Sequence, residues 1–313
     1  MVKAVILDGH TVKGEDLNFD AIRWLVDLTE YDNTSKEQVI GRVKGAEIVF
    51  TNKVIIDKEV MDACPELRFV AVFATGYNVV DVNYAKEKGI TVSNVPAYST
   101  DSVVQMTFAL ILELAVRVSV HAKAVADGEW KSCPYFCFWK TPLTELSGKT
   151  LGIIGYGSIG KAVEKVAKAF NMNVLVHNRT PFAGSVELEY LLENSDIVSL
   201  HCPLTAKNAK MINGDALAKM KKTAFLINTA RGPLVDEQAL YQALKNKDIA
   251  GAALDVIEKE PMAADNRLAE LDNCVITPHI AWATKEARSR LIEISVRNLK
   301  GYLDGKPINT VTG

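Results

Sequence analysis

The sequence predicts an α/β protein with two domains, each built on parallel strands that alternate with helices. Its 313 residues exceed the usual size of one hydrophobic core, and 48% of them are hydrophobic, as is ordinary for globular proteins. Short apolar runs alternate along the chain with segments of helical spacing, which is the pattern of a parallel sheet covered on both faces. The alternation stops near residue 95 and resumes at residue 151, so we expect two doubly wound sheets.

The first part of the chain supplies the strands of one sheet. Four apolar runs predict buried strands at residues 2–7, 47–50, 68–73 and 90–93, and helical spacing lies between them at residues 19–28, 57–63 and 83–88. A longer helix is expected from about residue 101 into the 120s, because Ser102 and Gln105 have the spacing of a capping box before an apolar face. The aromatic stretch Trp130–Trp139 contains Pro134 and predicts an exposed loop.

The second part supplies a six-strand sheet and a final helix. Its predicted strands lie at residues 151–154, 173–177, 196–200, 224–228, 250–255 and 275–277. Its predicted helices lie at residues 159–170, 186–193 and 237–245. The last segment, Thr284–Leu303, has the apolar spacing of an amphipathic helix.

The charge and the cysteines argue against several functional classes. The chain has 36 basic and 38 acidic side chains, so its net charge of −2 exerts no general attraction on nucleic acid or an anionic membrane. The apolar stretch Thr107–Val116 contains Glu113 and is too short to span a bilayer, and the N-terminus lacks the layout of a signal peptide. Five cysteines are an odd number in a long chain, and Cys133 and Cys137 lack zinc-site spacing. We therefore expect a cytoplasmic protein with no metal, nucleic-acid or membrane partner.

A glycine-rich motif lies between a predicted strand and a predicted helix. Its residues are Gly155-Tyr156-Gly157-Ser158-Ile159-Gly160. In this context the first glycine allows a tight turn, the second lets the backbone approach a pyrophosphate, and the third allows close packing of helix on strand. The helix N-terminus offers backbone N–H groups to the same phosphate. The motif therefore predicts a dinucleotide site.

The residues at the end of the next predicted strand bear on the choice of dinucleotide. An NAD-selective site usually presents Asp or Glu there, to bind the ribose hydroxyls. This chain instead has Asn178 and Arg179 after His177. Arg179 is able to pair with a 2′-phosphate, which favours NADP(H). The alternative is that Arg179 is a solvated residue at the strand end and the cofactor is NAD(H).

Three further candidates follow predicted strands of the second sheet: Arg231, Glu260 and His279. In an open α/β sheet the carboxyl ends of the strands border the ligand crevice. Each residue alone has an ordinary explanation, as a surface ion pair, a solvated carboxylate or a packed histidine. Together, at strand ends around one nicotinamide site, they indicate an Arg/Glu/His catalytic set.

These motifs stand in the order found in one enzyme family. The quoted segments are ATGYNVVD at 74–81, HCPLT at 201–205, NTARG at 228–232, DVIEKEP at 255–261 and TPHIAWAT at 277–284. With the glycine-rich motif they make the chain resemble the D-isomer-specific 2-hydroxyacid dehydrogenases over nearly its whole length, with Asn78 where Asp is commoner. Segments 94–105 and 136–139 most resemble the glycerate dehydrogenase and hydroxypyruvate reductase branch.

The resemblance implies a role for each candidate. Arg231 would bind the substrate carboxylate and polarise the ketone, His279 would donate the proton, and Glu260 would orient the imidazole. The backbone N–H groups of Thr75 and Gly76 would bind the rest of the carboxylate. The pyrophosphate would lie on Tyr156–Ile159. The adenosine and nicotinamide would be bordered by Cys202, Pro203, Thr229, Ala230 and Asp255.

The resemblance also implies the domain organisation. Residues 100–283 would form a Rossmann NAD(P)-binding domain. Residues 1–99 and 284–313 would form a discontinuous, flavodoxin-like substrate-binding domain, with the active site in the cleft between the two. Family members are usually homodimers through the nucleotide domain, and residues 101–149 would form the arm.

The resulting functional hypothesis is an oxidoreductase that transfers hydride between NAD(P)H and a small 2-keto acid, with hydroxypyruvate or glyoxylate as substrate and NADP(H) favoured over NAD(H). One alternative is a D-lactate-type dehydrogenase acting on pyruvate. Another is a non-catalytic regulator that binds a dinucleotide on the same fold. The intact set of Arg231, Glu260 and His279 argues against the regulator, since a pure binding module has no use for it.

Overall fold

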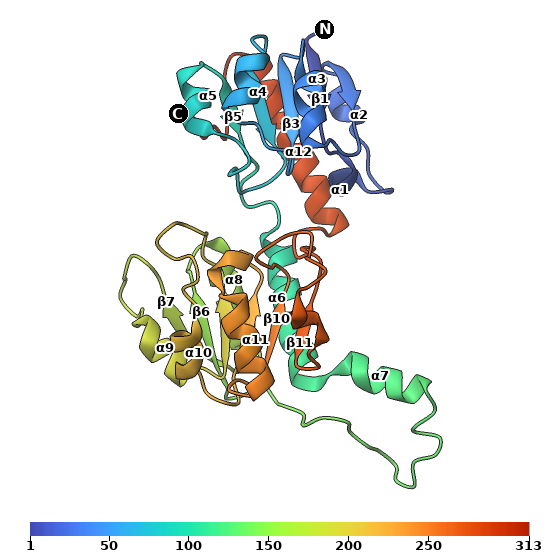
Figure 1. Ribbon diagram of the computed structural model, residues 1–313, viewed down its shortest axis with the longest axis vertical. Coiled ribbons are helices and arrows are strands. Elements are labelled where there is room, and N and C mark those ends of the chain that lie inside the picture. The colour runs from blue at the N-terminus through green and yellow to red at the C-terminus, as the bar shows by residue number, and fades with distance from the viewer. Residues whose placement is uncertain (313) are drawn as a thin grey trace. The chain divides into compact units, whose positions relative to one another are not determined.

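The computed structural model describes residues 1–312 and divides the chain into two compact units (Figure 1). Met1–Ser99 and the segment from Trp282 onward form the N-terminal unit, and Thr100–Ala281 forms the central unit. The chain crosses between the units after Ser99 and after Ala281.

The N-terminal unit contains a five-stranded parallel sheet of order β2-β1-β3-β4-β5. The strands are β1 (Lys3–Ile6), β2 (Asp27–Glu30), β3 (Ile48–Thr51), β4 (Phe69–Val72) and β5 (Thr91–Ser93). The helices are α1 (His10–Lys13), α2 (Asp20–Arg23), α3 (Val39–Val43), α4 (Lys58–Ala63), α5 (Val82–Glu87) and α12 (Lys285–Leu303). Strands β3 and β4 are buried along their whole length, as their uninterrupted apolar runs predict.

The prediction of a helix over residues 19–28 was wrong, because the end of this segment belongs to strand β2. Only Asp20–Arg23 is helical, and Asp27–Glu30 forms the edge strand beside β1. The core side chains Phe19, Ile22 and Val26 have helical spacing right up to the edge strand, so periodicity alone does not reveal the break. Pairing with β1 supplies backbone hydrogen bonds to the segment and overrides the local pattern.

Helix α12 belongs to the N-terminal unit although it comes from the end of the chain. Its residues Ala287, Leu291 and Leu299 are fully buried in the core of that unit, and Tyr302 stacks on Phe69 with ring centroids 4.5 Å apart. The C-terminal segment thus completes the fold that the first hundred residues begin.

The central unit contains a six-stranded parallel sheet of order β11-β10-β9-β8-β6-β7. All six strands were predicted: β6 (Thr150–Ile154), β7 (Asn173–His177), β8 (Ile197–Leu200), β9 (Phe225–Asn228), β10 (Gly251–Leu254) and β11 (Cys274–Ile276). The helices are α6 (Thr100–Val116), α7 (Val118–Ala126), α8 (Ser158–Ala169), α9 (Leu188–Asn194), α10 (Gly214–Lys219) and α11 (Glu237–Asn246). Helices α6 and α8 pack on one face and α9 to α11 on the other. The strand order reverses at β6, and ligands bind at such switch points in open α/β sheets.

The single long helix predicted from residue 101 is two helices. Arg117 lies between α6 and α7 with φ 51°, a left-handed conformation that interrupts the helical hydrogen bonds. Ser102 does not cap the helix, because its hydroxyl donates to the carbonyl of Ala281 at 2.6 Å. Within residues 1–312 no single helix is long and apolar enough to cross a membrane. Helices α6 and α7 reach that length and hydropathy only as a pair bent by 59°.

Candidate active site

The glycine-rich turn after β6 requires two of its glycines for steric reasons. Gly155 has φ 96°, and a Cβ there would lie 2.6 Å from the backbone nitrogen of Cys202. A Cβ on Gly160 would overlap the carbonyl oxygen of Gly155. Gly157 differs, because a Cβ there would have no heavy atom within 4 Å. The turn is therefore packed tightly against its own sheet and leaves open space above Gly157.

Helix α8 begins at this turn with its first N–H groups available to a ligand. Its N-cap is Gly157, in an extended conformation, and no side chain of the described residues caps it. The helix has 12 residues, so its aligned peptide dipoles place a partial positive charge at this end. These features provide an anion site at the position where the sequence predicts a pyrophosphate.

A pocket of about 540 Å³ opens beside the turn, within the central unit. Its walls come from the turn and from the loops that follow β7 and β8. The lining residues are Ile154, Gly155, Tyr156, Gly157, His177, Asn178, Arg179, Thr180, His201, Cys202, Pro203, Thr205, Lys207, Asn208 and Met211. The predicted cofactor residues from Gly155 to Gly157, with Asn178, Arg179, Cys202 and Pro203, are therefore brought together. Ser158 and Ile159 continue the turn as the first residues of α8, while Thr229 and Ala230 follow β9.

His201 is the most strongly perturbed titratable group of this pocket. Its Nε2 lies 2.9 Å from the hydroxyl of Ser199, and its buried Nδ1 has no hydrogen-bond partner among residues 1–312. Burial lowers the pKa of His201 to about 4. The imidazole is therefore neutral near pH 7 and adds no charge to the pocket.

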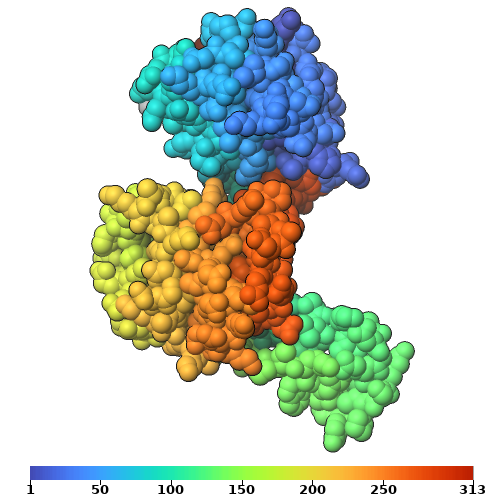
Figure 2. All heavy atoms as spheres, in the orientation of Figure 1, coloured from blue at the N-terminus to red at the C-terminus, as the bar shows by residue number. Residues whose placement is uncertain are grey.

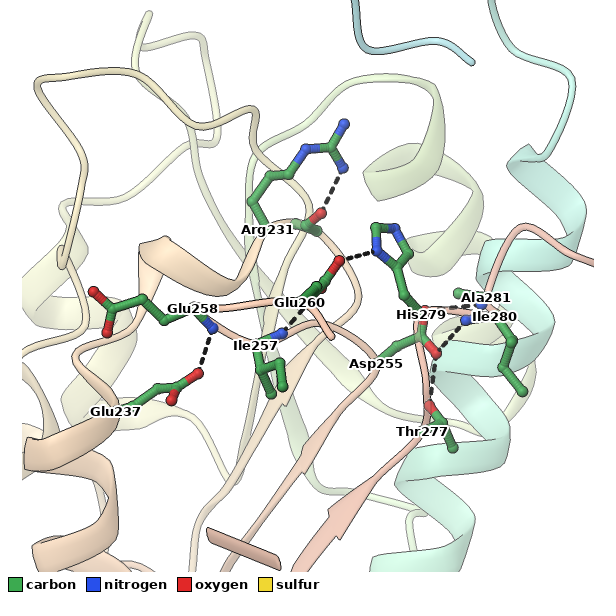
Figure 3. Close-up of polar contacts among 11 residues, drawn as sticks. Arg231, Glu237, Asp255, Ile257, Glu258, Glu260, Thr277, His279, Ile280 and Ala281 are labelled. Carbon is green, nitrogen blue, oxygen red and sulfur yellow. Dashed lines mark hydrogen bonds and ion pairs between the residues drawn. The ribbon is translucent and has the colours of Figure 1, made fainter. Parts of the chain in front are cut away.

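Arg231, Glu260 and His279 follow three neighbouring strands, β9, β10 and β11, at their carboxyl ends (Figure 3). The Nδ1 atom of His279 lies 2.6 Å from Oε2 of Glu260, and the other carboxylate oxygen of Glu260 accepts the N–H of Ile257 at 3.2 Å. The side chains of His279 and Glu260 are 25% and 35% exposed, so the pair is accessible to a small substrate. This geometry orients the imidazole through one nitrogen.

The loop that carries His279 is held by the buried carboxylate of Asp255. Its oxygens accept the hydroxyl of Thr277 at 2.6 Å and the N–H groups of Ile280 and Ala281 at 2.9 and 2.8 Å. His279 itself has φ 54° and donates its N–H to the backbone carbonyl of Asp255 at 2.8 Å. Burial raises the pKa of Asp255 in spite of these hydrogen bonds. Asp255 thus supports the left-handed turn that presents the imidazole.

The loop that carries Glu260 is held by Glu237, which the sequence analysis did not single out. The carboxylate of Glu237 accepts the N–H of Glu258 (Figure 3). It also accepts the side-chain amide of Asn266 at 3.0 Å. Glu237 is the first residue of α11, where the helix dipole favours a negative charge. In the sequence this position indicates only a helix start, because the partner loop lies about twenty residues further along the chain.

Arg231 is an exposed residue on a rigid turn. The side chain of Asn228 donates to the carbonyl of Arg231 at 2.9 Å and accepts the N–H of Ala230 at 3.0 Å. A Cβ on the next residue, Gly232, would overlap the carbonyl of Ile257, so this turn packs directly against the loop after β10. The guanidinium donates to the carbonyl of Ala230 at 2.6 Å.

Thr75 and Gly76 belong to the N-terminal unit, in the turn after β4. The Thr75 hydroxyl donates to the carbonyl of Val95 at 2.8 Å, and the side chain of Asn94 donates to the carbonyl of Thr75 at 2.7 Å. The turn is therefore fixed to the segment after β5. Elsewhere, among residues 1–312, no group of three or more His, Cys, Asp or Glu side chains is placed to hold a metal ion.

Comparison with known proteins shows similarity to one family. The family model described as D-isomer specific 2-hydroxyacid dehydrogenase, NAD binding domain, matches residues 108–281. A hydroxypyruvate reductase of Blautia hydrogenotrophica is 47% identical over 99% of both chains, and a glycerate dehydrogenase of Methylorubrum extorquens is 41% identical over 99% of this chain and 98% of its own. An NADPH-dependent glyoxylate/hydroxypyruvate reductase of Sinorhizobium meliloti, solved with NADP and malonate, has a TM-score of 0.84 and 28% identity, with 99% of this chain and 96% of the other covered.

The match covers both the motifs and the fold. The family model spans more than half of the chain and lies almost entirely within the central unit, which holds the glycine-rich turn and the residues Arg231, Glu260 and His279. The chain therefore belongs to the D-isomer-specific 2-hydroxyacid dehydrogenase family, in which it groups with the hydroxypyruvate reductases and glycerate dehydrogenases, and it is an NAD(P)-dependent oxidoreductase acting on CH–OH groups.

Proposed function

We propose that the protein reduces hydroxypyruvate or glyoxylate to the corresponding 2-hydroxy acid. The observation that carries this proposal is the 2.6 Å contact between His279 and Glu260 at the end of the sheet that also presents Arg231. A proton donor, its orienting carboxylate and an exposed guanidinium are the groups that reduction of a 2-keto acid needs. The names of the two relatives with 47% and 41% identity support the choice of substrate.

The pocket beside the glycine-rich turn fits a dinucleotide. The open space above Gly157 and the uncapped start of α8 match a pyrophosphate, and the pocket volume admits the adenosine end. Gly155–Gly160 would hold the pyrophosphate, and Asn178, Arg179, Cys202 and Pro203 the adenosine. Thr229, Ala230 and Asp255 would border the nicotinamide. When bound, the reduced nicotinamide supplies the hydride.

Arg231 and His279 have different roles toward the substrate. The planar guanidinium of Arg231 binds the carboxylate and polarises the ketone. His279 donates a proton from Nε2 to the ketone oxygen as hydride reaches the carbon, so the C=O group becomes CH–OH. The carboxylate of Glu260 accepts a hydrogen bond from the Nδ1–H group of His279 throughout. It stabilises the charged imidazole before the proton is transferred to the substrate. In the oxidative direction His279 takes the proton back.

The test is the kinetics of His279→Ala on a panel of keto acids: hydroxypyruvate, glyoxylate and pyruvate. We expect a loss of about 10²- to 10⁴-fold in kcat, because general acid catalysis is worth that much. His10→Ala, at an exposed histidine of the N-terminal unit, is the matched control and should retain activity. Near wild-type kcat in His279→Ala would contradict the proposal. Faster turnover of pyruvate than of hydroxypyruvate would favour the D-lactate-type alternative.

We also propose NADP(H) as the preferred cofactor, because Asn178 and Arg179 replace the carboxylate of an NAD-selective site. Both residues line the pocket, and Arg179 is exposed toward solvent. The measurement is kcat/KM for NADPH and NADH with hydroxypyruvate. A strong preference for NADH would overturn this part of the proposal and leave the catalytic assignment intact.

We propose a homodimer through the arm of residues 101–149, of which residues 118–146 are here called the aromatic arm. Figures 1 and 2 show this segment projecting from the body of the central unit. Its largest exposed side chains are Trp130, Tyr135, Phe136 and Trp139, with exposed fractions of 51%, 73%, 89% and 67%. Exposed aromatic residues in such numbers mark an interaction surface. Light scattering should give the mass of a dimer, and Phe136→Asp with Trp139→Ser should give a monomer. A monomeric wild-type protein would refute the assignment.

A further inference from the structure

The pocket beside the glycine-rich turn carries two cations and no carboxylate. Of the residues that line it, Arg179 and Lys207 are charged, and none is Asp or Glu. Neither cation forms an ion pair with any side chain of the described chain. The neighbouring Lys210 shows the contrast, since its ammonium pairs with Asp236 at 3.5 Å. The pocket therefore has unneutralised positive charge that an anionic ligand would satisfy.

The two cations come from loops on opposite sides of the turn. Arg179 follows β7 and Lys207 lies in the loop after β8, and these two strands flank β6 in the sheet. The glycine-rich turn at the end of β6 thus lies between them. Both side chains line the same pocket, so the 2′-phosphate of an adenosine bound beside this turn would lie between them.

The loop that carries Arg179 is fixed by the amide of Asn178. Its Oδ1 accepts the N–H of Tyr156 at 3.2 Å, and its Nδ2 donates to the carbonyl of Thr180 at 3.0 Å. Both polar atoms of the amide form hydrogen bonds, so Asn178 joins the glycine-rich turn to the turn after β7. An aspartate would be unable to donate to the carbonyl of Thr180 and would bring a negative charge into the pocket. The amide therefore serves an anion site better than a carboxylate.

We propose that Lys207 and Arg179 together form the binding subsite for the 2′-phosphate of NADP(H), with Asn178 as the positioning residue of that subsite. The inference rests on the proposed dinucleotide site and adds Lys207 to it. A 2′-phosphate monoester carries nearly two negative charges at neutral pH, so one cation neutralises only part of it. The guanidinium is able to donate two hydrogen bonds to the phosphate, whereas the ammonium acts as a point charge.

The experiment measures binding to the full chain by calorimetry, with adenosine 2′,5′-bisphosphate and 5′-AMP as probes. The two probes differ only in the 2′-phosphate. In Lys207→Ala we expect the affinity for the bisphosphate to fall roughly three- to tenfold, because the exposed ammonium is partly screened by solvent. In Arg179→Ala we expect a loss of about tenfold or more, in line with a charge-assisted bond to phosphate. In both variants the affinity for 5′-AMP should fall by a clearly smaller factor than the affinity for the bisphosphate.

Three further variants separate charge from structure. Lys165→Ala removes the same charge from an exposed position on α8 outside the pocket and should leave both affinities unchanged. Lys207→Arg keeps the charge and should restore most of the affinity for the bisphosphate. Asn178→Asp should weaken bisphosphate binding by a larger factor than 5′-AMP binding.

The outcomes distinguish this proposal from the proposed enzyme function. An unchanged ratio of the two affinities in Lys207→Ala would overturn the role of Lys207, even if the enzyme reduces hydroxypyruvate. An equal loss for both probes would also overturn it, because Lys207 would then bind the shared 5′-phosphate. A Lys207-dependent preference for the bisphosphate in a protein that reduces no keto acid would support the subsite and refute the enzyme function.

Discussion

Acidification from pH 7 to pH 5 should destabilise the central unit through His201. This imidazole lies between the end of β8 and the glycine-rich turn, with Nε2 hydrogen-bonded to Ser199 at 2.9 Å and Nδ1 buried. Protonation would place a charge where no carboxylate of the pocket lining faces it. Burial accordingly lowers the pKa of His201 to about 4, from an ordinary value near 6.5.

The sign follows from proton uptake on unfolding. Between about pH 4 and pH 6.5 the unfolded chain holds a proton on this histidine and the folded chain does not, so unfolding takes up a proton. Stability from this group is therefore fully present above pH 6.5 and is lost as the pH falls toward 4. The difference between the two pKa values corresponds to about 3 kcal/mol of folding stability, of which about 2 kcal/mol is lost by pH 5. That is a large part of the stability of an ordinary domain.

The assay is urea unfolding at pH 7 and pH 5, followed by circular dichroism, for wild type and His201→Gln. Glutamine keeps a hydrogen bond to Ser199 and does not titrate, so the variant should lose about 2 kcal/mol less than wild type between the two pH values. His10→Gln, at an exposed position, is the control and should follow wild type. Equal losses in wild type and His201→Gln would refute the reasoning, since the pH dependence would then come from other groups.

The remaining predictions concern the catalytic set. Arg231→Lys should raise KM and lower kcat, by about tenfold or more in kcat/KM, because an ammonium cannot span carboxylate and ketone; an effect confined to cofactor KM in steady-state kinetics would place Arg231 on the dinucleotide instead. Glu260→Gln should lower kcat for keto-acid reduction, since a neutral amide does not stabilise the charged imidazole; Glu258→Gln on the same loop is the control, and a wild-type kcat in Glu260→Gln would count against the pair. Glu237→Ala should lower kcat about fivefold without changing 5′-AMP binding, because it releases the backbone of Glu258 and the side chain of Asn266; unchanged kcat would show that the Glu260 loop keeps its position without this anchor.

Most of the sheets could be predicted because their strands are buried on both faces. The run Phe69–Val72 is apolar throughout and Ile197–Leu200 is apolar except for Ser199, and only a covered parallel sheet accommodates such runs in series. The edge strand β2 was not predicted, because one of its faces is solvated and the helical spacing of Phe19, Ile22 and Val26 leads directly up to it. The break between helices α6 and α7 at Arg117 was not predicted, because no glycine or proline marks it.

The candidate site was predictable in part, since catalytic chemistry restricts residue types at strand ends. The positions of Arg231, Glu260 and His279 after three strands follow from the apolar runs that precede them, and the structure places those strands side by side. The supporting contacts were not predictable. Glu237 and Asn266 are about thirty residues apart, and nothing in either local sequence indicates that their loops meet.

By itself the sequence determined the two parallel sheets, the glycine-rich turn and the chemical identity of the catalytic set, because these depend on local residue type and on spacing along the chain. Tertiary structure alone decided which charges are neutralised. Lys207 and Lys210 are three residues apart on one loop, yet Lys210 reaches Asp236 while Lys207 lines a pocket without a carboxylate. The physical reason is that an ion pair depends on which loops approach each other once the strands are assembled, and that order is set by packing between distant segments.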